Sequence, residues 1–369
     1  MAEPIRILHI VGAMYPGGME NFIMNLYREI DRQQFQFDFV VHLRKENDYK
    51  EAIEALGGRV YEIPRLTGHP VKSLISLYRL IRTNHYPIVI RHTANALVAV
   101  QLLAARLAGA RTICHSHNET DPGIRIHRLT RPLLRWTANR RLACSRGAGE
   151  WMYGGMDYRI IHNAIPIEKF AYSQEKAERI DREFGLEGKT VYGHIANFIA
   201  SKNHSFLLEV FARIKTKDPK AVLICLGDGQ LRPEIEEKIR QLGLTDEVIL
   251  AGSRPDACDF MSRFDLLLFP SLFEGLPLTL IEAQAAGLPQ LISSNITEDV
   301  ILTGGLVYSK SLEEDAECWA REATELVQRF REGRGSPREC QREAIRQAGY
   351  DSRQLAEWYQ EYLREILEL

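Results

Sequence analysis

The chain has 369 residues, 45% hydrophobic and 26% charged, which is long enough for two ordinary domains with buried cores. No run of about 18 apolar residues occurs, and the short apolar run near the N-terminus predicts a buried first strand instead of a signal peptide. The six cysteines are scattered without metal-ligand spacing, as expected for reduced thiols. These features predict a cytoplasmic protein without a membrane span.

The formal net charge of −2 is unevenly distributed along the chain. Residues 1–165 carry 22 Lys and Arg against 14 Asp and Glu, a net charge of +8. Residues 166–369 carry 25 against 35, a net charge of −10. This asymmetry indicates that one half of the chain meets an anionic partner.

Apolar runs and helical periods alternate through the first half of the chain. The predicted elements are strand 5–12, helix 19–30, strand 37–42, helix 51–58, strand 59–64, helix 71–84, strand 87–92, helix 96–110 and strand 111–117. Strands that alternate with helices of this length are typical of a doubly wound α/β sheet.

The same alternation restarts after the proline-containing segment NAIPIEKF (163–170). The predicted elements are strand 189–197, helix 203–219, strand 221–229, helix 230–243, strands 248–252, 265–271 and 289–294, and a last amphipathic helix over 352–369. We therefore predict two α/β domains in tandem.

Ligands of open α/β sheets bind at the carboxyl ends of the strands, so the loops there are the candidate sites. The first such loop is GAMYPGGME (12–20). Gly17 and Gly18 let the backbone approach a ligand, and the following helix N-terminus favours negative charge. The loop has neither dinucleotide nor phosphate-loop spacing, and a plain tight turn is an equal alternative.

The segment FPSLFEGLPLTLIEAQAAGLP (269–289) places Glu274 and Glu282 eight positions apart, around a predicted helix start. Free amides from Gly275 to Thr279 would form an anion site. A span of roughly 12 Å is too long for a shared acid–base pair, so the two carboxylates are predicted to hold the two ends of one long ligand with an anionic middle, such as a nucleotide-diphosphate sugar. Alternatively, Glu274 only complements the helix dipole and Glu282 is an exposed helix residue.

Three more loops at strand ends carry candidate residues. Lys202 in NFIASKNH (197–204) is predicted to meet a pyrophosphate, although a lone loop lysine is usually just solvated. The glycines of LGDGQLRPEI (226–235) fit a strand-to-helix turn. In HSHNET (115–120), His117 is expected to face the ligand side and His115 to point elsewhere. A lone histidine is more often structural.

With these residues in place, the chain resembles the family 4 retaining glycosyltransferases of the GT-B fold, in particular the bacterial exopolysaccharide and capsule members. The resemblance covers nearly the whole chain and rests on Glu274-GLPLTLI-Glu282, GGME, HNAIPIEKF, SKNH and GDG. It implies two Rossmann-like doubly wound domains facing a cleft. The N-terminal acceptor domain would be 1–165 and the nucleotide-sugar donor domain 166–349, with helix 350–369 packing back on the N-terminal domain.

The resemblance also implies roles for individual residues. Glu274 would bind hydroxyls of the donor sugar, Glu282 would bind the ribose, and His117 would lie beside the reacting sugar. The remaining donor-binding residues, which hold the diphosphate or pass the base, would be Gly17, Gly18, Lys202, Arg254, Gly275, Leu276, Pro277, Leu278 and Thr279. Asn197 stands where the family usually has an arginine, five residues before the lysine.

The implied activity is retaining transfer of a hexose from a UDP-sugar to a growing, lipid-linked glycan. No metal cofactor is expected, because a helix dipole and cations can offset the charge of the leaving diphosphate. Three alternatives stay open. They are a non-catalytic nucleotide-sugar-binding partner subunit, a nucleotide-sugar 2-epimerase on the same architecture, and a periplasmic-type binding protein.

Residues 122–149 hold seven arginines and no acidic residue. Four of them recur at helical spacing with apolar residues between them: Arg125, Arg128, Arg131 and Arg135. Such a stretch can lie on an anionic membrane, here the inner face of the cell membrane. A solvated helix face is an equal alternative, and Pro132 weakens one long helix. No nucleic-acid-binding module is present, so nucleic acid is not an expected partner.

Overall fold

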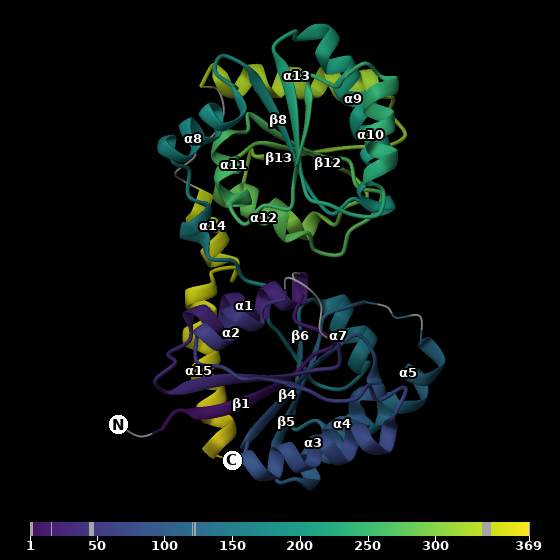
Figure 1. Cartoon of the computed structure of the whole chain (residues 1–369), viewed down its shortest axis with the longest axis vertical. Helices are drawn as coiled ribbons and strands as arrows, with labels where there is room; N and C mark the ends of the chain where they lie inside the picture. The colour runs from purple at the N-terminus through teal and green to yellow at the C-terminus, as the bar shows by residue number, and fades with distance from the viewer. Residues whose placement is uncertain are drawn as a thin grey trace. The chain divides into compact units, whose positions relative to one another are not determined.

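The computed structural model describes residues 3–15, 17–43, 48–119, 121, 123–333 and 341–368. The chain forms two compact α/β units (Figure 1). Unit 1 comprises Met1–Ile165 and Gly349–Leu369, and unit 2 comprises Pro166–Ala348. The sequence-based limits lie at 165/166 and 349/350, and the structure divides the chain at 165/166 and 348/349.

Unit 1 is built on a parallel sheet with the strand order β3-β2-β1-β4-β5-β6-β7. Its strands are β1 (Ile5–Ile10), β2 (Phe35–Val41), β3 (Val60–Glu62), β4 (Ile88–Thr93), β5 (Arg111–Ser116), β6 (Arg140–Ala143) and β7 (Arg159–Ile160). Its helices are α1 (Gly18–Glu29), α2 (Lys50–Ala55), α3 (Pro70–Asn84), α4 (Ala99–Leu107), α5 (Ile124–Thr130), α6 (Leu134–Thr137), α7 (Arg146–Tyr153) and α15 (Ser352–Glu368).

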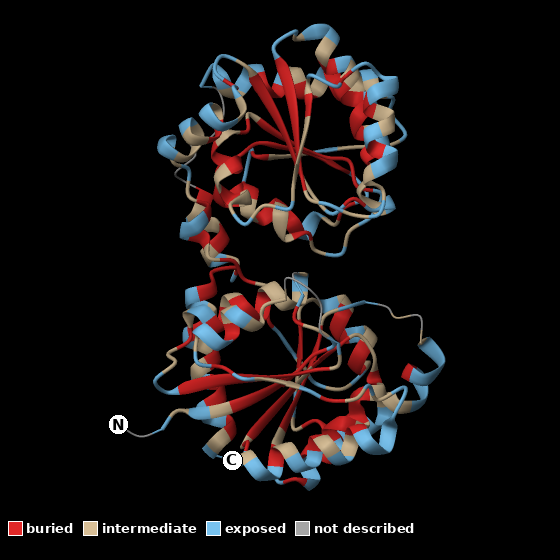
Figure 2. Cartoon of the chain, in the orientation of Figure 1, coloured by how far each residue is buried: buried red, intermediate tan, exposed pale blue. Residues whose placement is uncertain are grey.

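Alternating side chains of β1 serve two separate cores, one on each face of this sheet. Ile7 packs in a cluster with residues of α1, whereas Leu8 and Ile10 pack with residues of α3 and α4. The central strands are mostly buried, whereas the edge strands β3 and β7 are not (Figure 2). Burial on both faces explains why the strands read as continuous apolar runs in the sequence.

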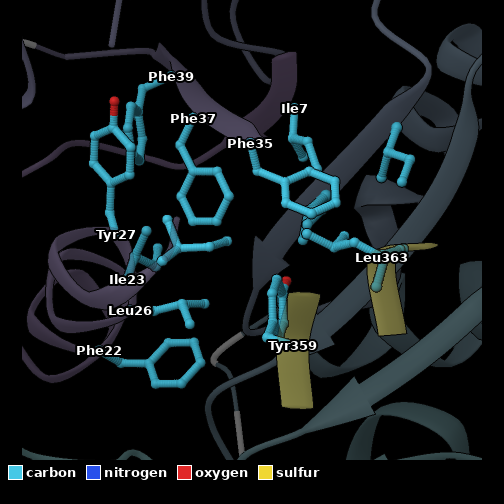
Figure 3. Packing of buried hydrophobic residues seen from close by; sticks show 14 of the residues in the cluster. Ile7, Phe22, Ile23, Leu26, Tyr27, Phe35, Phe37, Phe39, Tyr359 and Leu363 are labelled. Carbon is cyan, nitrogen blue, oxygen red and sulfur yellow. The ribbon is translucent and has the colours of Figure 1, made fainter. Parts of the chain in front are cut away.

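The last helix, α15, completes the core of unit 1. Tyr359 and Leu363 are fully buried in the same cluster as Ile7 and Phe35 (Figure 3). The backbone of Ile165 also forms an isolated parallel bridge with Asp351, next to the start of α15. The C-terminal helix therefore belongs to the unit in which the chain begins.

Unit 2 repeats the topology with the strand order β10-β9-β8-β11-β12-β13. Its strands are β8 (Thr190–Ile195), β9 (Ala221–Leu226), β10 (Val248–Gly252), β11 (Leu266–Phe269), β12 (Gln290–Ser293) and β13 (Val307–Lys310). Its helices are α8 (Gln174–Phe184), α9 (His204–Lys217), α10 (Arg232–Gln241), α11 (Ala257–Arg263), α12 (Leu278–Ala285), α13 (Ala316–Arg331) and α14 (Gln341–Gln347). In both units the first strand lies between the second and the fourth, as in a Rossmann fold.

The arginine-rich segment is not one helix. α5 ends at Thr130, a 3₁₀ turn covers Arg131–Leu133, and α6 is a single turn that leads into β6. Pro132 lies inside the 3₁₀ turn, since proline has no N–H to continue α5. Pro122, the first residue of the predicted segment, lies outside the described residues.

None of the described helices is both long and apolar enough to span a bilayer. The five cysteines in the described segments are free thiols, and Cys340 lies outside those segments.

Candidate functional site

The loops that follow β8 and β11 are tied together in unit 2. The two strands are neighbours at the point where the strand order reverses, which is where ligands of open α/β sheets bind. The backbone N–H of Leu272 donates to Ser201 O at 2.8 Å, and Asn203 Nδ2 donates to Pro270 O at 3.1 Å. These bonds hold the lysine loop against the loop that carries Glu274.

The side chains of Lys202 and Glu274 form an ion pair across these two loops. Lys202 Nζ lies 2.5 Å from Glu274 Oε1, and the side chains are only 16% and 11% exposed. The ammonium also lies 5.5 Å from the centre of the Phe269 ring. The pair fixes the Glu274 carboxylate before any ligand arrives, and the structure brings together two residues that the sequence placed 72 positions apart.

Four amides beside this pair are unoccupied donors. Pro277 is the N-cap of α12, and no side chain caps the helix. Within the described residues, the N–H groups of Gly275, Leu276, Leu278 and Thr279 have no hydrogen-bond acceptor. Pro277 itself has no N–H, so its predicted contact with a diphosphate cannot be a backbone hydrogen bond. The donors and the helix dipole favour an anion at this point.

Glu282 lies in the second turn of α12. Burial raises the pKa of its carboxyl group from 4.5 to about 7, and the charge of Lys169 offsets part of this effect. Among the described residues, the carboxylate has neither a hydrogen-bond donor nor an ion-pair partner. A desolvated, unpaired carboxylate is suited to accept hydrogen bonds from the hydroxyls of a ligand.

The turn after β9 supports the lysine loop through its glycines. Gly227 has a φ of +130°, and a Cβ there would overlap the carbonyl of Ala196. A Cβ on Gly229 would come within 2.5 Å of the carbonyl oxygen of Phe198. Only glycine allows the turn after β9 to approach the backbone of the lysine loop this closely. The predicted glycine turn therefore supports the conformation of that loop.

Two predicted positions of unit 2 make no contact with the ion pair. The Arg254 guanidinium pairs with Glu183 and Asp256 and lies over the rings of Phe184 and Phe260. Its contact with a base stays a prediction, and these carboxylates already occupy its donor groups. Asn197 is exposed at the start of the lysine loop.

In unit 1, Gly17 and Gly18 begin α1. Gly17 is the N-cap in an extended conformation with φ −163°. A Cβ added to Gly18 would have no atom within 4 Å. The open space around Gly18 suits the predicted approach of a ligand, and that role stays a prediction.

The half-buried His117 belongs to a chain of histidine rings, with the buried His9 and His92, at the carboxyl ends of β1, β4 and β5. His9 Nδ1 lies 3.0 Å from His92 Nε2, and His92 Nδ1 lies 2.9 Å from His117 Nε2. Burial lowers the pKa of His9 and of His117 to about 3, and holds the pKa of His92 and His115 well below 6.5. These imidazoles are therefore neutral at physiological pH.

The expectation for His115 was wrong. Its ring centre lies 4.1 Å from that of His117, so both rings are on the same face of the sheet. The physical reason is the two-residue period of a strand, which places residues i and i+2 on one face. His9 and His92, which complete the cluster, were not singled out in the sequence, although both lie near strand ends.

The basic segment forms an exposed surface of apolar and basic residues, here called the α4–α6 surface. Its apolar residues include Leu129 and Trp136, 80% and 67% exposed, together with Ile126 and Leu133. Its exposed cations are Arg125, Arg128 and Arg135. The structure adds Leu103 and Leu107 of α4, because Arg106 donates a 2.6 Å hydrogen bond to the carbonyl of Trp136. Monomeric proteins rarely expose such a group of large apolar side chains without a partner.

Comparison with known proteins supports this description of both units. The family model for glycosyltransferase family 4 matches residues 16–169, and the model for glycosyl transferases group 1 matches residues 189–329. HepE of Anabaena in complex with UDP superposes with a TM-score of 0.80 over 98% of this chain and 100% of HepE, at 17% identity. The lipopolysaccharide glycosyltransferase WaaG gives a TM-score of 0.69 over 96% of this chain and 98% of WaaG, at 13% identity. The predicted two-domain Rossmann-like GT-B fold is confirmed.

Two curated relatives cover most of the chain. The glycosyltransferase EpsF of Bacillus subtilis is 36% identical, over 95% of this chain and 94% of EpsF. A UDP-Gal:α-D-GlcNAc-diphosphoundecaprenol α-1,3-galactosyltransferase of Escherichia coli is 25% identical, over 79% of each chain. The first identity and its coverage show the family: the chain belongs to glycosyltransferase family 4.

Proposed function

We propose that this protein transfers a hexose, with retention of configuration and without a metal ion, from a UDP-sugar to a lipid-diphosphate-linked glycan in exopolysaccharide or capsule synthesis. The observation that carries the proposal is the row of free amides at the start of α12, which lies between the Lys202–Glu274 pair and the unpaired Glu282. An anion site between two carboxylates matches a nucleotide-diphosphate sugar, whose hydroxyl-bearing ends flank its diphosphate.

Each group of the site has a role in the transfer. Glu274 accepts hydrogen bonds from the hexose hydroxyls, and Glu282 accepts them from the ribose. The α12 amides and Lys202 stabilise the negative charge that develops on the diphosphate as the glycosidic bond breaks. The acceptor hydroxyl attacks from the same face and passes its proton to the departing phosphate oxygen. No protein base is then needed, in agreement with the depressed pKa values of the unit 1 histidines.

The donor is tested with UDP-glucose, UDP-galactose, UDP-N-acetylglucosamine and GDP-mannose, each without metal. Thermal shift and slow donor hydrolysis are measured for the wild type, Glu274→Ala and Glu282→Ala. The exposed Glu298→Ala serves as the control. We expect one UDP-sugar to bind and to be hydrolysed, and both site substitutions to abolish this. No binding to any of the four would contradict the proposed site.

A second candidate function is that of a non-catalytic nucleotide-sugar-binding subunit. It is favoured by Asn197, a neutral residue at the position where family members usually carry an arginine. Donor binding without hydrolysis in the wild type, followed by hydrolysis in Asn197→Arg, would support this candidate. Formation of an epimeric UDP-sugar in the same assay would instead indicate an epimerase.

The lipid-linked acceptor is supported by the α4–α6 surface and by the diphosphoundecaprenol acceptor in the name of the E. coli relative. Arginines near an anionic bilayer contribute about 1 kcal/mol each, so Arg125→Gln, Arg128→Gln and Arg135→Gln together should weaken binding to phosphatidylglycerol vesicles about 100-fold. Sedimentation with vesicles measures this effect. The matched control is the neutralisation of three exposed arginines of unit 2: Arg182, Arg213 and Arg240. An equal loss of vesicle binding in both triple variants would contradict a specific role of the α4–α6 surface in membrane binding.

A further inference from the structure

Four ring nitrogens of the unit 1 histidine cluster are buried without a hydrogen-bond partner in the described residues: Nε2 of His9, Nδ1 and Nε2 of His115, and Nδ1 of His117. His115 is fully buried, and in the described residues neither of its ring nitrogens has a hydrogen bond. Nδ1 of His117 is likewise a buried atom without a hydrogen-bond partner in the described residues. Buried polar atoms are nearly always paired, with protein, water or an ion. An ion or a water molecule can supply the missing partners of these two adjacent rings.

We propose that His92, His115 and His117 form a binding site for one transition-metal ion of the zinc class. Each of the three residues offers a ring nitrogen, and these atoms all lie within 4.8 Å of one another. His92 and His115 are paired in register on neighbouring strands, and His117 follows His115 on the same face. Imidazole suits zinc, copper and nickel, and three histidines with one solvent position are a common zinc ligand set.

The ring geometry matches such an ion closely. With Zn–N bonds of about 2.0 Å and tetrahedral angles, the centres of two bound imidazoles lie about 5 Å apart. The observed centre-to-centre distances are 5.2 Å for His92–His117 and 5.4 Å for His92–His115. The His115–His117 distance is shorter, at 4.1 Å, so metal binding requires these two rings to separate by about 1 Å.

His9 provides the support that a metal-binding histidine normally has. When His92 binds the ion through Nδ1, its proton resides on Nε2, which lies 3.0 Å from His9 Nδ1. A hydrogen bond from the second ring nitrogen orients a metal-bound imidazole and raises its basicity. His9 is itself fixed between Phe37 and Phe39, with ring centres at 4.2 and 5.4 Å.

The proposed ion is separate from the transfer chemistry. It takes one ring nitrogen of His117, so that metal binding competes with any contact between this ring and the donor sugar. This last consequence rests on the proposed function, and it predicts that zinc inhibits transfer. Metal binding itself does not rest on that function, because it is measured without donor.

The test is a titration of the untagged full-length protein with Co²⁺, followed by visible absorption and equilibrium dialysis. We expect one equivalent of cobalt with intense tetrahedral bands, and no charge-transfer band from thiolate. His92→Ala and His117→Ala should lower the affinity at least 100-fold. His9→Ala should lower it about tenfold, since the supporting contact and not a ligand is lost.

Two controls separate metal binding from misfolding and from surface sites. His69→Ala removes an exposed histidine, and His204→Ala removes a buried histidine of unit 2; neither should change cobalt binding. Zinc should raise the unfolding temperature of the wild type and of these controls, but not of His117→Ala, whose half-buried side chain is the most easily replaced. Cobalt binding that survives His92→Ala and His117→Ala, or that shows thiolate charge transfer, would overturn the proposal. Water alone at the cluster would give no tetrahedral bands in the wild type.

Discussion

Units 1 and 2 repeat one strand order, but the residue near the end of the first strand has different hydrogen-bond partners in the two units. His9 and His194 are each the penultimate residue of the first strand in their sheet. In unit 1, His9 Nδ1 lies 3.0 Å from a ring nitrogen of His92, whereas His194 Nδ1 in unit 2 lies 2.8 Å from the carbonyl of Leu268, and its ring meets His204 edge to face. The fold therefore provides a location, and the side chains at the strand ends decide the chemistry there.

The two strand-end regions also differ in charge. Unit 1 gathers four neutral imidazoles, whereas unit 2 gathers an ammonium, two carboxylates and free amides. The charged groups of unit 2 suit the proposed binding of an anionic donor, whereas the imidazoles of unit 1 offer only uncharged contacts.

The largest expected effect is that of Glu274→Gln. The substitution removes the charge that receives the sugar hydroxyls and leaves Lys202 without its partner, so kcat should fall about 10²- to 10³-fold. His117→Asn, its counterpart in unit 1, should cost only about tenfold, since a neutral hydrogen bond contributes less. Steady-state transfer rates measure both. A larger fall in kcat for His117→Asn than for Glu274→Gln would show that unit 1 contributes more to the transfer than unit 2.

The second effect concerns pH. The pKa of Glu282 is raised to about 7, and only its carboxylate form accepts the ribose hydroxyls. Protonation therefore opposes binding, and the affinity for a UDP-sugar should fall about 100-fold as the pH drops from 8 to 5. The cluster histidines, with pKa values far below this range, contribute nothing to the slope. Calorimetric titrations across this range test the expectation.

Glu282→Gln is the control for the pH dependence. Its donor affinity should be weak at every pH, with no slope between pH 5 and 8. A slope that persists in this variant would show that another group controls binding.

The smallest effect comes from two glycines of unit 2. Gly275→Ala meets no atom within 4 Å, so the free protein should keep its stability within about 0.5 kcal/mol while donor affinity falls about tenfold. Gly229→Ala presses on the Phe198 carbonyl and should cost about 1–3 kcal/mol of unfolding free energy as well. Urea unfolding and donor titration separate the two cases. Equal destabilisation would mean that the space at Gly275 is needed by the fold, not by a ligand.

Much of the proposed donor site could be expected from the sequence because it lies on one short segment. Glu274, the free amides and Glu282 follow one another around a single helix start, so local rules of helix geometry are enough to expect them. The ion pair with Lys202 was not predictable, since it depends on the packing of two loops that the β8–β11 neighbourhood brings together. Arg254 shows the converse case. The sequence predicted that it contacts a ligand, and the structure pairs its guanidinium with Glu183 and Asp256.

Several elements could not be predicted from local patterns. β6 begins with two arginines in a segment whose spacing resembles a basic helix, so the sheet pairing with β5 decides its conformation. The α4–α6 surface likewise joins helices that are separate in the sequence, and only the contact of Arg106 with Trp136 shows their adjacency.

The sequence by itself determined the two α/β units and the family, because periodicity and glycine positions are local properties of the chain. The same local signals predicted the proposed donor loop. Only the tertiary structure decided that Lys202 pairs with Glu274 and that four histidines meet at one point. These features depend on which strands become neighbours. The order of the strands depends on how the apolar faces of sheets and helices bury one another. These faces come from distant parts of the chain, so no short segment specifies the order.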